Sequence, residues 1–349
     1  MRTDARTDTR TATESGDRAA TQQALEVITG GWRAQALYTA VKMALPDHIE
    51  AGRTTSAALA AATGAEEEGV HRLLRLLVAM GVFAGDERAG YRNTPVSATL
   101  LNRPDSLRDM CLLYGEDFYT AWGHAYEAIT TVSAGFELAY GQPLYAYLDR
   151  HEDVSERFQR AMRAGNLFFD HVPGVFDFSG GKRVVDVGGG GGHLLATILA
   201  AVPDTRGVLL DRPNVVPIAE RNLTAAVGPD RAEVTGGDMF AAVPPDGDVY
   251  LLCRVLAGWE DDEVAGVFAN CRRAMSGEDA RLIILDRLVA DEEPTVLPSL
   301  WDLHLMMTNG GRHRTLDRYT ALLERAGLDV ERVAELPMET TAIIAARRH

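Results

Sequence analysis

The sequence predicts an α/β protein: a Rossmann-like, doubly wound, mostly parallel sheet of seven strands, preceded by an all-helical domain that contains a winged helix. Three observations predict this fold class. Helical periodicity dominates from Gln22 to about Ser179. After Gly180, strand-like apolar runs alternate with helical stretches, which is typical of a parallel sheet covered on both faces. A run of glycines follows the first of these strands, as expected where a ligand approaches the carboxyl edge of a sheet.

Length, composition and charge fit a two-domain soluble enzyme. The chain has 349 residues, of which 46% are hydrophobic, and this length suits two domains. Its 35 basic and 50 acidic side chains give a formal net charge of -15. This balance argues against a nucleic-acid partner, because phosphate binding needs an excess of Lys and Arg. Residues 1–20 mix Thr, Arg, Asp and Ala, lack the apolar core of a signal peptide, and predict a disordered tail.

Cysteine and histidine usage predicts a cytoplasmic protein without a metal. Cys111, Cys253 and Cys271 form no CxxC pair, which indicates reduced thiols. The nine histidines show no metal-binding spacing. No apolar stretch is long enough to cross a membrane, so neither a metal nor a membrane is expected as a partner.

The helical part begins with an apolar face that repeats every three to four residues. Trp32, Leu37, Val41 and Leu45 carry this face, and Pro46 follows where the helix is expected to end. Long helices rich in aromatic residues are predicted again between Cys111 and Phe169.

A winged helix is predicted between these helical stretches. Thr55 and Ser56 open a short helix over 57–62, a turn follows, and a second helix carries its apolar face between Val70 and Val78. The pair Val82-Phe83 and the segment 91–93 would form the wing. Winged helices can bind DNA, but this one carries more acids than arginines and no basic recognition helix. Helical packing and subunit contact are therefore the expected uses of this surface.

The second half of the chain supplies the strands of the predicted sheet. The candidate strands, in chain order, are Arg183–Val187, Val208–Leu210, Ala232–Thr235, Asp248–Leu252, Arg281–Leu285, Leu328–Val333 and Thr341–Ala345. The last two are expected to close one edge of the sheet as a hairpin.

A cofactor site is predicted at the carboxyl edge of this sheet. The strand 184–187 runs directly into glycines 188–192. Asp211 ends the next strand, where a carboxylate can bind both hydroxyls of a ribose. Asp238 follows the third strand and can accept from an adenine amino group, with Met239 packed on the ring. A glycine run alone also marks nicotinamide and flavin sites, and each acid alone could merely cap a turn; the ordered set favours S-adenosylmethionine.

Five motifs carry a resemblance to a known family. They are VVDVGGGGG (184–192), LLDRP (209–213), GGDMF (236–240), YLLCRVLAGWEDDE (250–263) and GGRHRT (310–315). In these motifs, and over roughly residues 20–347, the chain resembles plant and bacterial small-molecule O-methyltransferases with an N-terminal winged-helix dimerisation domain. The resemblance is strongest to members from actinobacterial natural-product pathways.

The resemblance implies a cofactor, an acceptor and a partner. The cofactor would be S-adenosylmethionine, the acceptor an aromatic or polyketide-like small molecule, and the partner a second copy bound through the N-terminal domain. Implied cofactor contacts are Gly188, Gly190, Asp211, Asp238, Met239, Cys253 and Arg254. Implied acceptor contacts are Met162, Trp259, Met306, Met307 and Asn309. Trp259 and Asp261 are also expected to serve packing and helix capping, and His304 to lie in the core or the pocket wall.

The expected domains follow from the same comparison. A dimerisation domain would occupy 21–110, a helical linker with substrate-pocket helices 111–178, and the cofactor-binding catalytic domain 179–349.

The chain departs from the family where catalysis is expected. Most members read VLHDW at the end of the fourth strand, and that His removes the proton of the acceptor hydroxyl. Here the segment ends with Ala257-Gly258-Trp259, so this base is absent. Members commonly read GGxERT, with a Glu that orients the base, and this chain has His313 at the Glu position. Asp286 stands where another orienting acid is often found.

Several hypotheses remain open at this point. His313 could act as base from the opposite wall of the pocket, oriented by Asp286. Alternatively, no base is used, because a near-attack pose can contribute about 7–11 kcal/mol whereas a general base contributes about 10²–10⁴-fold. His313 could also simply hydrogen-bond within its loop. Relatives without the His sometimes catalyse non-methylating reactions, in which the cofactor charge stabilises developing negative charge, and a binding or regulatory role is a further alternative.

Overall fold

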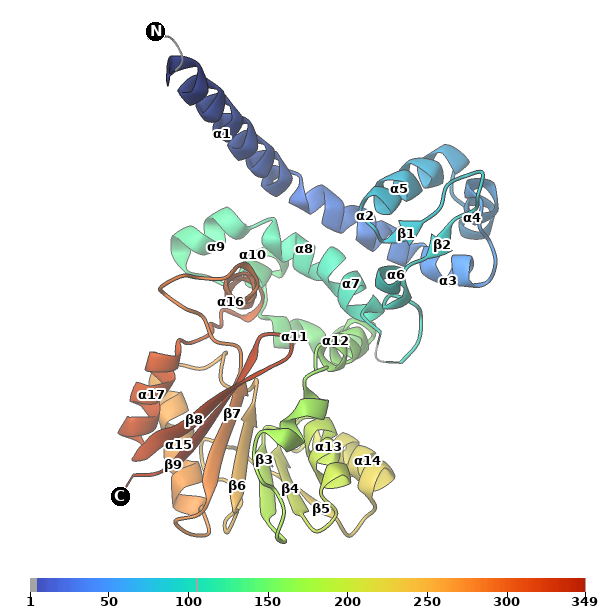
Figure 1. Cartoon of the computed structure of the whole chain (residues 1–349). Coiled ribbons are helices and arrows are strands. Elements are labelled where there is room, and N and C mark those ends of the chain that lie inside the picture. Colours follow the sequence, from blue (N-terminus) through green and yellow to red (C-terminus); the bar gives the residue numbers. More distant parts are fainter. Residues whose placement is uncertain (1–4, 105, 349) are drawn as a thin grey trace. The chain divides into compact units, whose positions relative to one another are not determined.

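The chain folds into two compact units, each described here by itself. The computed structural model describes residues 5–104 and 106–348. The first unit comprises Met1–Tyr119 and His151–Gly165, and the second comprises Thr120–Arg150 and Asn166–His349 (Figure 1). Residues 151–165 thus belong to the N-terminal unit, whereas the sequence-based boundaries placed them in a separate helical linker.

The first unit is helical apart from a two-stranded wing. Its helices are α1 (Ala5–Ile28), α2 (Gly30–Lys42), α3 (Leu45–Glu50), α4 (Ser56–Thr63), α5 (Glu67–Ala79), α6 (Pro95–Ala98), α7 (Arg108–Gly115) and α12 (Glu152–Ala164). The wing strands are β1 (Phe83–Ala84) and β2 (Arg92–Asn93), which pair antiparallel. Leu59, Val70 and Leu74 share one buried cluster with Phe83 of the wing. The predicted winged helix is confirmed.

Two predictions for the N-terminal region are wrong. Pro46 does not end a helix that reaches it: α2 ends at Lys42, and Pro46 lies in the first turn of α3, where its missing N–H costs nothing. The tail predicted to be disordered over 1–20 is helical from Ala5 onward, and residues 1–4 lie outside the described residues. This segment contains several alanines and arginines and no proline, so its composition permits a helix.

The second unit contains the sheet and two groups of helices. A helix that crosses from the first unit, α8 (Asp117–Trp122), is followed by α9 (Ala125–Thr131), α10 (Gly135–Tyr140), α11 (Leu144–Leu148) and the 3-10 helix η1 (Phe169–Gly174). The helices between or after the strands are α13 (His193–Ala201), α14 (Val216–Val227), α15 (Asp261–Ala274), α16 (Val296–Asn309) and α17 (Leu316–Arg325). Helices α9, α10 and α11 all pack against α16.

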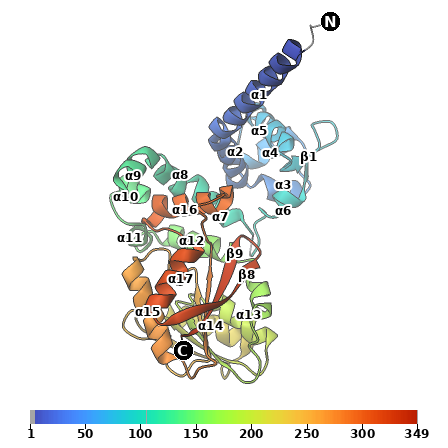
Figure 2. The ribbon, with the colours of Figure 1, turned by 60° about the vertical axis from the view of Figure 1, so that its left-hand side comes forward.

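Seven strands form one mostly parallel sheet. They are β3 (Arg183–Val187), β4 (Arg206–Asp211), β5 (Ala232–Gly236), β6 (Val249–Cys253), β7 (Arg281–Asp286), β8 (Leu328–Leu336) and β9 (Thr340–Arg347). Their order is β5-β4-β3-β6-β7-β9-β8, and β9 alone runs opposite to the others, antiparallel to both β7 and β8. These two strands, coloured red, form the predicted edge hairpin (Figure 2). The predicted fold class is confirmed.

Helices cover both faces of the sheet and leave its carboxyl edge for ligands. One buried cluster joins the sheet to α15 and α17, and another joins it to α13, α14 and η1 (Figure 1). Strand order reverses at β3, whose neighbours are β4 on one side and β6 on the other. Ligands of open α/β sheets bind at such a switch point, outside the carboxyl ends of the strands. Among the described residues, no helix has both the length and the apolar character that a membrane crossing requires.

Candidate functional site

The glycine turn after β3 brings backbone to the switch point. Gly188 has φ +72°, and a Cβ there would lie 2.6 Å from Cγ2 of Val255, so only glycine fits. Gly190 also has a positive φ, but a Cβ there would meet no atom within 4 Å. The backbone of Gly190 therefore faces open space that a ligand can enter, as a cofactor cradle requires.

Both predicted cofactor acids lie at the same sheet edge as this turn. Oδ2 of Asp211 accepts a hydrogen bond from the backbone N–H of Gly190 at 2.8 Å, and Oδ1 accepts from Arg212. The N–H of Gly237, just after β5, donates to the carbonyl of Asp211 at 2.9 Å and so joins the ends of β4 and β5. Oδ1 of Asp238 accepts from the N–H of Phe240 at 2.9 Å. The two acids thus cap turns, as the simpler hypothesis expected, and they also share the edge that the cofactor hypothesis requires.

Side chains from other elements contact the loop after Asp238. The Asn270 amide donates to the carbonyls of Met239 at 2.8 Å and Phe240 at 2.9 Å. The Trp259 ring meets the Phe240 ring edge-on at a centroid distance of 4.7 Å. Trp259 is therefore placed beside the loop that carries Asp238 and Met239, and its predicted acceptor contact stays a prediction.

The backbone and the guanidinium of Arg254 both contact neighbouring residues. It has φ +52°, and its N–H donates to the Leu285 carbonyl at 2.9 Å. Its guanidinium donates to Asn166 at 2.9 Å and to Thr340 at 3.0 Å, and lies 4.4 Å from the centroid of Phe168. A cofactor contact by Arg254 would therefore come from its backbone.

Sequence reasoning missed Asp186, which lies within β3 beneath the glycine turn. The residue is 1% exposed, and neither carboxylate oxygen has a hydrogen-bond partner among the described residues. A Cβ on Gly189 would lie 2.6 Å from its Oδ2. Burial, with the charge of Asp211 as a second cause, raises the pKa of Asp186 to about 7. An acid inside an otherwise apolar strand was the available signal.

Replacing Asp186 with asparagine is expected to stabilise the protein at alkaline pH. The pKa of Asp186 is higher in the folded chain than in the unfolded chain, so the folded state binds the proton more tightly, and stability falls as pH rises from about 4 through about 7. Urea unfolding should show Asp186→Asn more stable by roughly 2–4 kcal/mol at about pH 8 and close to the parent at about pH 5. The matched control is Asp230→Asn at an exposed position. An equal effect at both pH values would contradict this explanation.

His313 and Asp286 form the candidate catalytic pair. Nδ1 of His313 lies 3.6 Å from Oδ1 of Asp286, just beyond hydrogen-bond reach. Asp286 is 1% exposed, and it accepts from the Tyr319 hydroxyl at 2.6 Å and from the N–H of Arg287 at 2.8 Å. Burial by itself raises the pKa of Asp286, but His313 and the Tyr319 hydroxyl outweigh it and hold that pKa below the ordinary value. Nδ1 is the ring nitrogen on the Asp286 side, so Nε2 faces away from the carboxylate.

Ala257, which replaces the family's usual base, lies in a loop that contacts the loop of His313. The N–H of Arg312 donates to the carbonyl of Ala257 at 2.8 Å. A Cβ on Gly311 would lie 2.7 Å from that same carbonyl oxygen, so the two loops touch. This hydrogen bond joins the loop of His313 to the loop of Ala257, and action of His313 from the opposite wall of the pocket stays a prediction.

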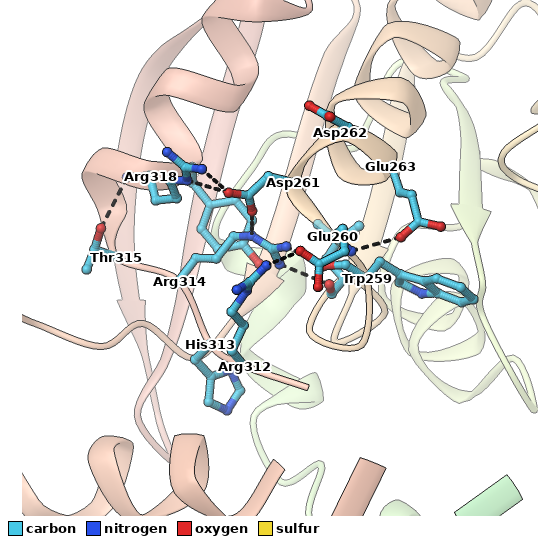
Figure 3. A network of polar contacts seen from close by, with 12 residues as sticks. Trp259, Glu260, Asp261, Asp262, Glu263, Arg312, His313, Arg314, Thr315 and Arg318 are labelled. Carbon is cyan, nitrogen blue, oxygen red and sulfur yellow. Dashed lines mark hydrogen bonds and ion pairs between the residues drawn. The ribbon is translucent and has the colours of Figure 1, made fainter. Parts of the chain in front are cut away.

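A buried arginine holds these two loops together (Figure 3). Arg314 is 3% exposed and donates to Asp261 at 2.8 Å, to the Leu256 carbonyl at 3.0 Å and to the Trp259 carbonyl. Arg318 pairs with the same carboxylate from the surface. The ring of the neighbouring His313 points away from this network (Figure 3).

The helix cap expected at Asp261 is provided by its neighbour. Glu260 is the N-cap of α15 and forms a capping box with Glu263, whose carboxylate accepts from the Glu260 N–H at 2.9 Å. Asp261 instead binds Arg314 and Arg318. The capping role predicted for Asp261 is wrong by one residue.

The predicted acceptor residues have different surroundings. Met307 is wholly buried, and its Sδ would lie 3.2 Å from a Cβ on Gly135 of α10. Met306 is half-buried, and Asn309 accepts from the N–H of Gly311 at 2.9 Å. Met162 lies on α12 in the first unit. Acceptor contacts by these residues stay predictions.

A second aromatic group around α16 was not anticipated from the sequence. Nε1 of Trp122 donates to Nδ1 of His304 at 3.1 Å, and the two rings stack. Burial, with the charge of Arg287 as a second cause, lowers the pKa of His304 to about 4. The guanidinium of Arg287 lies 4.5 Å from the ring centroid of Trp301. In the described part of the chain, no group of three or more His, Cys, Asp or Glu residues could hold a metal.

Two family profiles match the chain. The profile of the O-methyltransferase domain matches residues 122–329, and that of the O-methyltransferase dimerisation domain matches residues 25–103. The chain belongs to the O-methyltransferase family. The catalytic domain of this family thus covers the glycine turn, both acids and the pair His313–Asp286.

Individual relatives include both N- and O-methyltransferases. The chain is 45% identical to the phenazine-1-carboxylate N-methyltransferase of Pseudomonas aeruginosa, over 94% of this chain and 98% of the relative. It is 39% identical to the 3-amino-4-hydroxybenzoate 4-O-methyltransferase of Streptomyces cremeus, over 97% of this chain and 93% of the relative.

Solved structures agree with this assignment. The pyocyanin biosynthetic protein PhzM superposes with a TM-score of 0.87 at 44% identity, over 94% of this chain and 99% of that chain. A methyltransferase of calicheamicin biosynthesis in its SAH-bound form matches with a TM-score of 0.83 at 28% identity, over 94% and 98% of the two chains. The chain is an S-adenosylmethionine-dependent methyltransferase of secondary metabolism, and the open cradle at Gly190 fits that cofactor.

Proposed function

We propose that this methyltransferase methylates a hydroxyl of an aromatic or polyketide-like small molecule, mainly by holding the acceptor in line with the cofactor. The supporting observation is that His313, whose loop is hydrogen-bonded to Ala257, lies close to Asp286 at the end of β7. When bound, S-adenosylmethionine supplies a methyl group on a positively charged sulfur. Positioning contributes most of the acceleration, since a near-attack pose is worth about 7–11 kcal/mol. His313 accepts the proton of the hydroxyl, and Asp286 orients the ring.

The cofactor contacts belong to the same proposal. Asp211 would bind the ribose hydroxyls, Asp238 the adenine amino group, and Met239 the face of the ring. The backbone of Gly188 and Gly190 would approach the remainder of the cofactor. The positions of these residues around one sheet edge support this assignment.

Methylation of an aromatic ring nitrogen is a second candidate. A pyridine-like nitrogen attacks with its lone pair and loses no proton, so it needs no base. Ala257 favours this candidate, because it leaves the family's usual base position without a proton acceptor. The relative that is 45% identical is named for N-methylation. No comparison favours the non-methylating alternative, since the relatives reported above are named as methyltransferases.

The acceptor class can be tested with two acids and their matched amides. The protein is incubated with S-adenosylmethionine and either 3-amino-4-hydroxybenzoate, phenazine-1-carboxylate or the corresponding carboxamide of each. Mass spectrometry and NMR then identify the methylated atom, and S-adenosylhomocysteine is quantified in parallel. Methylation of the hydroxybenzoate oxygen supports the first candidate, and methylation of the phenazine nitrogen supports the second. Consumption of acceptor without S-adenosylhomocysteine would contradict both.

Replacement of His313 separates the two candidates kinetically. For a hydroxyl acceptor, His313→Ala is expected to lower kcat about 10²–10⁴-fold, because general-base assistance is lost. The deficit should shrink as pH rises and the acceptor ionises by itself. For a ring-nitrogen acceptor, kcat should stay close to the parent. The exposed His171→Ala serves as control. Unchanged turnover of a hydroxyl acceptor at neutral pH would exclude His313 as base.

A homodimer is part of the proposal. The dimerisation profile covers 25–103, and apolar side chains are exposed along α1 and α2 of this unit. Trp32 is 70% exposed and Val27 is 76% exposed, which is unusual for an apolar surface without a partner. Light scattering of the purified protein is expected to give twice the chain mass.

A further inference from the structure

A stacked arginine stands next to the candidate catalytic pair. The guanidinium of Arg287 lies 4.5 Å from the ring centroid of Trp301, which itself meets the ring of His304 edge-on at 5.7 Å. The N–H donors of a guanidinium point outward in its own plane, so stacking on an aromatic face does not cover them. These donors can bind a carboxylate with two parallel hydrogen bonds. The arrangement therefore combines two aromatic rings, one edge-on to the other, with a positive charge stacked on Trp301.

Backbone contacts place this group beside His313. Leu288 forms a parallel bridge with Arg314, and the N–H of Val289 donates to the Arg314 carbonyl at 3.3 Å. Arg287 therefore lies alongside His313, one residue earlier in each segment. From the other side, the carboxylate of Asp302 accepts from the N–H of His313. Asp302 follows Trp301 directly in α16, so the backbone at Trp301, like the backbone at Arg287, lies close to His313.

Arg287 carries the positive charge beside Trp301 and His304, because the imidazole of His304 is neutral. His304 is 9% exposed, and its lowered pKa of about 4 keeps it neutral. Trp122 donates to Nδ1 of His304, which fixes the tautomer with hydrogen on Nε2. The carboxylate of Asp286 already accepts from Tyr319. In a chain with a formal net charge of -15, an anionic acceptor needs such a local positive charge.

We propose that Arg287 binds the acid group of the acceptor, and that the natural acceptor is a planar aromatic carboxylate lying against Trp301 and His304. This inference rests on the proposed methyl transfer, and it adds the acceptor's chemical class and the residue that selects it. Arg287 is a specificity-determining residue here and takes no part in moving the proton or the methyl group.

The acid and amide probes test this selection directly. For Arg287→Gln, KM for the acid is expected to rise about 10- to 100-fold, the value of one charge-assisted pair, while KM for the amide stays within about twofold. Arg287→Lys should fall between, because the ammonium keeps the charge and loses the two-point contact. The exposed Arg325→Gln, whose side chain pairs with Asp262 at the surface, is the matched control. Circular dichroism checks that each variant is folded.

Calorimetry with S-adenosylhomocysteine-saturated protein gives a readout that needs no turnover. Phenazine-1-carboxylate should bind the parent about 10- to 100-fold more tightly than it binds Arg287→Gln, with little difference for phenazine-1-carboxamide. Equal losses for acid and amide would show a structural role for Arg287 and overturn the proposal, as would no loss for either. Selective acid binding without any methylated product would refute the proposed function and leave the acid site standing.

Discussion

Asp211→Ala is expected to weaken S-adenosylmethionine binding about 100- to 1000-fold. A carboxylate that accepts from both ribose hydroxyls makes two charge-assisted hydrogen bonds, together worth about 3–4 kcal/mol. The same substitution removes the acceptor of the Gly190 N–H, which holds the glycine turn against β4. Both losses act on the cofactor, so S-adenosylhomocysteine should lose affinity in parallel. Isothermal titration calorimetry measures both.

Two further variants make this expectation specific. Asp211→Asn keeps an oxygen for the Gly190 N–H and removes the charge, so its affinity should fall between the parent and the alanine variant. Asp230→Ala changes an exposed acid elsewhere in the same unit and should leave binding unchanged. If Asp211→Ala bound S-adenosylmethionine within about threefold of the parent, Asp211 would be only a turn cap.

Arg314→Met is expected to destabilise the protein by about 3 kcal/mol. Removing one partner of a buried ion pair leaves the other charge uncompensated, which costs about 3–5 kcal/mol when both partners are buried. Asp261 keeps Arg318 as a partner, which reduces the loss. The carbonyls of Leu256 and Trp259 lose a donor as well. The loop around Ala257 should loosen in consequence, and methyl transfer should fall together with stability.

The surface partner of the same carboxylate provides the control. Arg318 also binds Asp261, but its side chain is 56% exposed, and exposed pairs contribute about 0–1 kcal/mol. Urea unfolding of Arg318→Met should therefore differ little from the parent. Similar destabilisation by the two substitutions would mean that the loop carbonyls and the burial of Arg314 contribute nothing of their own.

The strands were predictable because burial leaves a simple pattern. β3 begins and ends at the predicted residues Arg183 and Val187. β6 is shifted by one residue from its prediction, and the other strands extend theirs by one to three residues at an end. A central parallel strand is covered on both faces, so its sequence is a continuous apolar run. The bounds of helices follow weaker signals. Pro46 was compatible with the end of one helix and with the first turn of the next, and only the packing of α3 decides between them.

The candidate site was predictable only where topology alone places residues. Asp211 ends β4 and Asp238 follows the end of the neighbouring parallel strand β5, so their shared edge follows from strand order. Contacts between distant loops have no local pattern. Ala257 and Arg312 are far apart in sequence, and only the structure reveals the hydrogen bond that joins their loops.

Stacking contacts between side chains could not be predicted from the sequence for the same reason. Trp122 and His304 lie 182 positions apart, and their hydrogen bond depends on how the helices around α16 pack. Arg287 follows Asp286 immediately, but its stacking on Trp301 depends on the position of α16 over the end of β7. Asp186 is the opposite case, since an acid within an apolar strand is visible without any structure.

Cys253 at the end of β6 is a thiol that S-adenosylmethionine could methylate. S-adenosylmethionine methylates sulfur readily when sulfur is present as an anion, because the thiolate is the reactive form. Burial raises the pKa of Cys253 far above its ordinary value, so the side chain stays protonated at neutral pH. A protonated sulfur competes poorly for the methyl group, so Cys253 is expected to resist methylation by the cofactor.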